Sequence, residues 1–218
     1  MSAFRHLFII SLYASLGAYR LFSGEVPLHT GAVLTISRPE KIRWLVQRTS
    51  TLSIAGSTNI NRFCCQVNAY TGPDTIVSQK EAGAAISAAV PLKGILCIDI
   101  EDFNCSNRIM TGEFKKTLKY RQYPQLKILF VSLEKMPSFG TVTETIKGCV
   151  EVELAGVNRK FEISYSSCRT GDAEMDLIGS RTFGFSDFGL TPPRKMGGLV
   201  RVNDRLDVLF RLHLRPIN

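Results

Sequence analysis

Apolar and polar residues alternate along much of this chain, most clearly between residues 146 and 165. The alternation changes parity after the Ala155-Gly156 pair, so the segment consists of two runs joined by a short turn. A period of two is typical of strands with one buried and one solvated face, and the turn makes the two runs an antiparallel hairpin. The apolar positions of this hairpin are Ile146, Val150, Val152, Leu154, Phe161, Ile163 and Tyr165.

Similar alternation recurs on both sides of the hairpin. Residues 51–70 predict one long strand bent at Gly56. The closing segment, residues 206–214, alternates leucine, valine and phenylalanine with charged residues. Each of these segments therefore has one face for a core and one for solvent.

One short helix interrupts the strands. Residues 111–121 predict it, because Thr111 can cap the first turn and because Phe114 and Leu118 lie one turn apart. About eight strands with one short inserted helix predict an all-β, antiparallel closed barrel rather than a parallel α/β sheet.

The N-terminus has a different pattern. Arg5 and His6 precede an apolar stretch over residues 7–18, which is too short to span a bilayer, and small residues follow. This pattern indicates a secretory signal peptide, residues 1–24, and hence export. We expect an N-terminal leader segment or edge strand over residues 25–43 and a barrel domain over residues 44–218. A buried N-terminal helix is the alternative for the first segment.

The chain is basic, with a formal net charge of +8 that falls to +6 without residues 1–24, which contain Arg5, Arg20 and no acid. This surplus favours anionic partners, and we expect transient contact with an anionic membrane surface. A merely solvated basic surface is the alternative. No lysine or arginine cluster interleaves with aromatic residues as nucleic-acid binding requires, so we expect no nucleic-acid partner. The sequence leaves the oligomeric state open.

Six cysteines occur in a chain expected to be exported, where disulfides persist. We predict a bridge between Cys65 and Cys105, because both lie at strand ends that a meander places side by side. Cys64 is the competing partner, and because alternation sends Cys64 and Cys65 to opposite faces, only one of them can meet Cys105. Closing this loop stabilises the fold by about 4 kcal/mol in the chain-entropy model. No metal-ligand spacing is present, so we predict no metal site.

Four phrases of the sequence resemble one known family. They are YPQLKILF (residues 123–130), LAGVNRKFEI (154–163), FSDFGL (185–190) and VNDRLDVLFRLHL (202–214). Together with Trp44 at the opening they are similar to the YceI-like family of exported lipid-binding proteins. This resemblance implies a lipocalin-like barrel in the periplasm whose apolar interior holds a polyisoprenoid. Many members carry an Arg-Asp-x-His-Leu phrase before the helix, whereas this chain has Arg108 without the Asp and His.

A lipid-binding role predicts an apolar site defined by shape and area, with no cofactor. The expected ligand-binding residues are Ile98, Phe114, Leu118, Phe130, Val152, Phe161, Phe185 and Phe210. The same side chains would fill the interior of a structural envelope protein with a solid core, which is the alternative.

Catalytic signatures are absent from the sequence. No nucleophile elbow, phosphate-binding loop or zinc-protease motif occurs, and His29 and His213 are the only histidines after the predicted signal. We expect Asp187 to accept structural hydrogen bonds in a barrel corner. We therefore predict a binding protein with no catalytic residue, with a hydrolase or redox enzyme acting on such lipids as the alternative.

Overall fold

The computed structural model describes residues 40–80, 89–137, 144–171 and 174–217. The chain divides into two units, residues 1–35 and 36–218, and every described residue belongs to the second. The predicted signal peptide and the predicted leader up to residue 39 lie outside the described residues. Residues 40–43, the end of that leader, are part of the first strand.

Antiparallel strands make up most of the described chain. They are β1 (Glu40–Val46), β2 (Thr51–Thr58), β3 (Arg62–Val67), β4 (Thr75–Lys80), β5 (Val90–Lys93), β6 (Ile95–Asp99), β7 (Gln125–Leu133), β8 (Glu144–Leu154), β9 (Val157–Arg169), β10 (Met175–Gly184), β11 (Arg194–Lys195) and β12 (Val200–Ile217). The helices are α1 (Arg108–Thr117) and the 3-10 turns η1 (Ile100–Asp102), η2 (Phe185–Phe188) and η3 (Met196–Gly198).

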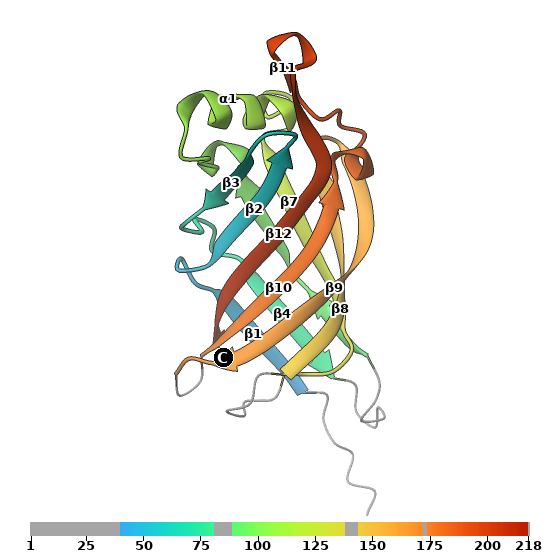
Figure 1. Cartoon of the computed structure of the whole chain (residues 1–218). Coiled ribbons are helices and arrows are strands. Elements are labelled where there is room, and N and C mark those ends of the chain that lie inside the picture. Colours follow the sequence, from blue (N-terminus) through green and yellow to red (C-terminus); the bar gives the residue numbers. More distant parts are fainter. Residues whose placement is uncertain (1–39, 81–88, 138–143, 172–173, 218) are drawn as a thin grey trace, which may run out of the picture. The chain divides into compact units, whose positions relative to one another are not determined.

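The strands close into an eight-stranded antiparallel barrel, as the alternation predicted (Figure 1). The sheet runs from β1 through β4, β5, β7, β8, β9 and β10 to β12, and β12 returns to β1. The long strand β12 pairs with β10 along one edge, and its other edge pairs first with β2 and then with β1. Closure therefore joins the two ends of the described sequence.

The alternation places the core inside the barrel. In the β8–β9 hairpin, Ile146 pairs with Tyr165 and Val150 with Phe161, and all four side chains are buried. The turn between the strands has positive φ at Ala155 and Gly156, which fits a two-residue hairpin turn.

The segment over residues 51–70 is two strands, so the prediction of one long strand is wrong. Residues 59–61 form a tight turn in which the Thr58 hydroxyl oxygen accepts hydrogen bonds from the amides of Ile60 and Asn61. Side-chain bonds of this kind give the backbone an alternative to the sheet ladder. The apolar Ile60 concealed the turn in the sequence pattern, and its side chain is exposed.

The helix is present but starts earlier than predicted. Asn107, not Thr111, is its N-cap, and the Asn107 Oδ1 atom accepts hydrogen bonds from the amides of Ile109 and Met110. These apolar residues occupy the exposed first turn, so the apolar pattern pointed to a later start. No helix in the described part of the chain is long and apolar enough to cross a membrane.

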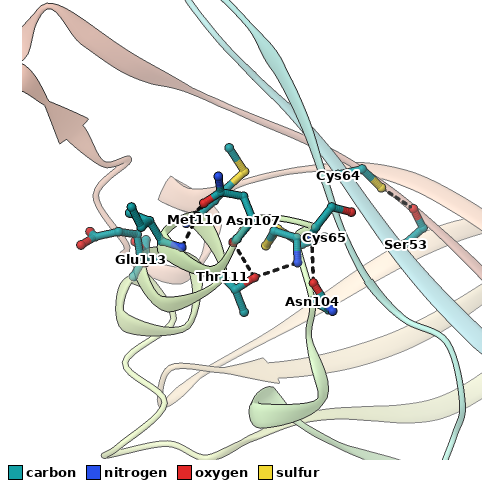
Figure 2. Close-up of a disulfide and its surroundings, with 12 residues drawn as sticks. Ser53, Cys64, Cys65, Asn104, Asn107, Met110, Thr111 and Glu113 are labelled. Carbon is teal, nitrogen blue, oxygen red and sulfur yellow. Dashed lines mark hydrogen bonds between the residues drawn. A yellow bond between two sulfur atoms is a disulfide. The ribbon is translucent and has the colours of Figure 1, made fainter.

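The disulfide between Cys65 and Cys105 is present, as predicted, and it ties β3 to the segment that leads into α1 (Figure 2). A β-bridge between Gln66 and Asn104 brings the two segments together. The Cys105 amide also donates to the Thr111 hydroxyl at 3.0 Å, which connects the disulfide to the first turns of α1. Cys64 points the other way, toward the Ser53 hydroxyl.

Candidate functional site

An apolar cavity of about 70 Å³ lies inside the barrel at the end covered by α1. Its wall is made of residues from six strands, β2, β7, β8, β9, β10 and β12, together with the inner side of α1 and the turn η2. All the side chains that line it are aliphatic or aromatic; they include Leu52, Phe103, Phe114, Leu118, Val152, Phe183, Phe185, Phe188 and Phe210. A second cavity, of about 20 Å³, lies farther along the interior.

The structure brings most of the predicted ligand-binding residues to these cavities. Those that line the larger cavity are Phe114, Leu118, Val152, Phe185 and Phe210. Ile98, Phe130 and again Phe210 line the smaller one. Phe161 lines neither; it is buried against the rings of Phe183 and Phe188, at centroid distances of 4.8 and 5.8 Å.

Several residues of the cavity wall escaped the sequence reasoning. Phe103 follows η1, and its ring meets Phe114 edge to face at 5.5 Å. Phe188 lies in η2, within the FSDFGL phrase already singled out, and period two cannot predict its direction because η2 is not a strand. The only sequence signal that could have indicated Phe103 and Phe188 is the presence of aromatic residues beside each irregular turn.

Polar groups hold η2 in place at the edge of the cavity. The Asp187 carboxylate accepts a hydrogen bond from the Gly184 amide at 2.8 Å, the structural role predicted for it. From β12, the Asp204 carboxylate accepts from both the amide and the hydroxyl of Ser186, at 2.9 and 2.5 Å. Charge-assisted bonds of this kind are strong, so they fix the turn that carries Phe185 and Phe188.

Phe210 lies between the two cavities and lines both of them, as do Leu52 and Ile128. It pairs across the sheet with Gly179, which pairs in turn with Tyr165. The Phe210 ring occupies the space over Gly179, where an added Cβ would lie 2.1 Å from its Cζ atom. The ring also meets Tyr165 edge to face at 5.7 Å. We use this inward row, Phe210, Gly179 and Tyr165, as the boundary between the part of the interior near α1, the α1 half, and the rest, the far half.

The far half contains polar atoms that the α1 half lacks. The Tyr165 hydroxyl is buried with no hydrogen-bond partner among the described residues, and burial raises the pKa of this phenol. At the smaller cavity, the Tyr70 hydroxyl donates to the Asp74 carboxylate. Burial and then this bond raise the pKa of Tyr70, so both phenols are neutral.

A cluster of titratable residues, His213, Glu174 and Asp176, lies on the outer face of the barrel beside the far half. On β12, the His213 ring contacts two carboxylates, Asp176 through Nδ1 at 2.8 Å and Glu174 through Nε2 at 3.2 Å. The hydrogen bond to Asp176 raises the pKa of His213 against the opposing effect of burial. Because carboxylates occupy both ring nitrogens, the ring has no position left for activating a serine or cysteine nucleophile.

No group of metal-ligating side chains suited to an ion was found among the described residues. Two carboxylates that could act as acids or bases pair instead with lysines: Glu153 with Lys127 at 3.1 Å and Glu101 with Lys115 at 2.9 Å. The polar groups of the interior are few: beside the phenols of Tyr70 and Tyr165, Ser50 and Thr51 line the smaller cavity, and the other residues of both cavity walls are apolar.

No protein-family model and no curated protein sequence matches this chain. Solved structures do match. BcnA from Burkholderia cenocepacia aligns with a TM-score of 0.54 and 13% identity, covering 75% of this chain and 95% of that one. A polyisoprenoid-binding domain from Saccharophagus degradans aligns with a TM-score of 0.52 and 13% identity, covering 79% and 97%. A mutant CJ YceI protein follows at 0.46 and 16% identity, covering 56% and 70%.

This chain shares its antiparallel barrel fold with BcnA and with the polyisoprenoid-binding domain. The alignments extend over nearly the full length of the first two structures. At 13% identity, the structural similarity establishes the architecture of the chain. The ligand must be inferred from the residues of this chain.

Proposed function

We propose that this YceI-like barrel binds a polyisoprenoid or similar long-chain lipid in the α1 half of its interior. The observation that carries the proposal is the larger cavity, whose wall is apolar throughout. An isoprenoid tail has no hydrogen-bonding groups, and each Å² of apolar surface it buries contributes about 25 cal/mol. The polyisoprenoid-binding domain that shares this fold supports the choice of ligand class.

The cavity must widen to accept such a ligand. Engineered cavities of about 150 Å³ hold benzene, and drug-sized ligands use about 300–1,000 Å³, whereas this cavity measures about 70 Å³. The wall offers the means, because α1 rests on it through Phe114 and Leu118 and η2 through Phe185 and Phe188. Rotation of these rings, or displacement of α1, enlarges the space without breaking the strand ladder.

The proposal includes carriage or storage in an oxidising compartment such as the periplasm. The Cys65–Cys105 disulfide supports this location, since such bonds persist outside the reducing cytosol. The role requires binding alone, so the chain acts without a catalytic step.

A structural envelope protein with a filled core is the second candidate, and the small cavity volume favours it. Native mass spectrometry of protein purified from its own host separates the two. A co-purifying lipid supports the binding proposal. Protein that is free of lipid and takes up no fluorescent isoprenoid analogue supports the filled core and contradicts the binding proposal.

A charge placed in the cavity provides the sharpest mutational test. Val152→Asp, whose side chain lines the cavity, should abolish uptake of the fluorescent isoprenoid analogue while circular dichroism still reports a folded barrel. The matched control is Ser164→Asp, which adds the same charge on the outer face opposite Lys147 and should leave uptake unchanged. His213→Ala should also leave uptake unchanged. Loss of a measurable turnover in His213→Ala would instead establish an enzyme.

A further inference from the structure

Exposed apolar side chains gather at the α1 end of the barrel. The described residues include seven large apolar side chains that are exposed, and five of these lie in three neighbouring segments. The five are Ile60 in the β2–β3 turn, Ile109 and Met110 in the first turn of α1, and Met196 and Leu199 between β11 and β12. Four of them are at least 64% exposed. We call these five residues the apolar rim.

The three segments of the rim are joined to one another. Asn59, next to Ile60, donates through its side-chain amide to the Leu199 carbonyl at 2.9 Å. Lys195, next to Met196, forms an ion pair with Glu113 of α1 at 2.6 Å. A groove of about 360 Å³ runs between the segments, with Ile109 and Met110 among its lining residues. Figure 1 shows α1 and β11 at the same end of the barrel. The rim is therefore one surface.

Basic side chains surround this surface. Residues 59–63, 107–113 and 194–202, which hold the rim, contain the basic residues Arg62, Arg108, Arg194, Lys195 and Arg201, all exposed. Their single acid is Glu113, which Lys195 neutralises. On the other side of α1, a second groove is lined by Lys116, Lys119 and Arg121, with no carboxylate among its described lining residues. The end of the barrel combines apolar tips with excess positive charge.

The groove borders the lipid cavity. Phe114 and Phe185 line both the groove and the larger interior cavity, so these two rings form the partition between surface and interior. Only the side chains of Phe114 and Phe185 therefore separate a partner bound in the groove from the cavity. This continuity, together with the charge, identifies the occupant.

We infer that the apolar rim docks on an anionic phospholipid bilayer, with its side chains inserted among the lipids and its basic residues on the headgroups. Aliphatic tips on turns insert into the boundary between headgroups and acyl chains, and each nearby lysine or arginine adds attraction to an anionic surface. The bilayer then faces the partition formed by Phe114 and Phe185. Docking itself does not need the proposed function, whereas passage of lipid into the barrel rests on it.

Vesicle flotation tests the docking. The full chain should float with vesicles of phosphatidylcholine and phosphatidylglycerol and much less with vesicles of phosphatidylcholine alone. Ile109→Asp/Leu199→Asp should weaken vesicle binding about tenfold or more. The matched control, Ile95→Asp/Leu209→Asp, changes two exposed apolar residues outside the rim and should leave binding unchanged. Equal loss in both pairs, or no loss in the rim pair, overturns the inference.

The charge requirement has its own pair of variants. Arg108→Gln/Arg194→Gln should weaken binding to anionic vesicles about tenfold, and Arg48→Gln/Arg215→Gln, also exposed but outside the rim, should have little effect. Equal binding to neutral and anionic vesicles contradicts the inference. So does a rim variant that abolishes self-association of the wild-type chain in light scattering without changing vesicle binding, because the rim would then join two copies.

A second readout separates docking from ligand binding. The rim variant should still take up a fluorescent isoprenoid analogue presented in detergent, because its cavity is intact, while losing uptake from anionic vesicles. A wild-type chain that floats with vesicles but takes up no analogue in either form supports docking and contradicts the proposed function. A chain that takes up the analogue in detergent but does not float contradicts docking alone.

Discussion

The two halves of the barrel interior, on either side of Phe210, are built differently. In the α1 half, irregular turns and a helix carry aromatic rings onto a cavity of about 70 Å³. In the far half, strand residues such as Ile146, Tyr165 and Leu214 are tightly packed, and each is at most 2% exposed. Strand ladders fix side chains on a rigid wall, whereas α1 rests on the barrel through side chains such as Phe114 and Leu118. The half that can change shape is thus the half with the larger cavity.

The disulfide is the strongest constraint on the α1 half, and its removal should have the largest effect on stability. Cys65→Ala/Cys105→Ala should lower the free energy of unfolding by about 4 kcal/mol, because the unfolded chain regains the freedom of a closed loop. Urea denaturation of oxidised protein measures the change. Cys64→Ala, beside the bridge but exposed, is the control and should stay near the wild type. A loss below about 1 kcal/mol would show that the ladders hold this half without the bridge.

Overpacking the dividing row should have the next largest effect. Gly179→Ala forces the Phe210 ring out of its position, since the new methyl would lie 2.1 Å from the ring. We expect a loss of about 1–3 kcal/mol in the free energy of unfolding. Gly112→Ala has nothing within 4 Å of its new methyl group and lies in α1, so it should gain up to about 1 kcal/mol. If Gly179→Ala is neutral, Phe210 moves freely and the two halves are not separate.

The two buried phenols of the interior should respond with opposite signs. Tyr165→Phe removes a hydroxyl without a partner among the described residues and should raise the free energy of unfolding by about 1 kcal/mol. Tyr70→Phe removes the donor to Asp74 and should lower it by about 1 kcal/mol. Thermal and urea denaturation of both variants measure this pair. A destabilised Tyr165→Phe would show that the far half supplies a partner to that hydroxyl.

The smallest effect is the pH dependence from His213 on the outer face of the far half. Its folded pKa lies above the ordinary value of 6.5, because Asp176 and Glu174 accept hydrogen bonds from the protonated ring. The resulting stability is fully present below the unfolded pKa and is lost as the pH rises through the higher folded pKa. Arg211, which contacts Asp176 at 3.4 Å, is charged throughout this range. His213→Asn should lack this decline in unfolding curves between about pH 6 and 8, and an unchanged decline would assign it to another group.

The sequence determined the strands with period two and the hairpin between them. It also determined which residues face inward, because alternation at a two-residue turn admits one register with an apolar interior. The pairing of Cys65 with Cys105 rested on their similar settings at strand ends, and side-chain parity added only that Cys64 and Cys65 cannot both meet Cys105. The same reasoning failed at residues 59–61 and at Asn107, where apolar residues occupy exposed turns and their local hydrogen bonds give no periodic signal.

Tertiary structure decided what the interior is. The barrel closes because β12 pairs with β1, although the two strands lie at opposite ends of the described sequence. No local sequence pattern specifies a pairing between strands so far apart in the chain. The irregular segments decided the cavity, because Phe103 and Phe188 line it only once η1 and η2 are placed over the barrel. The volume of a cavity is the small difference between the volume that the barrel wall encloses and the volume of the side chains inside it. The apolar rim likewise exists only because folding brings three separate turns to one end of the barrel.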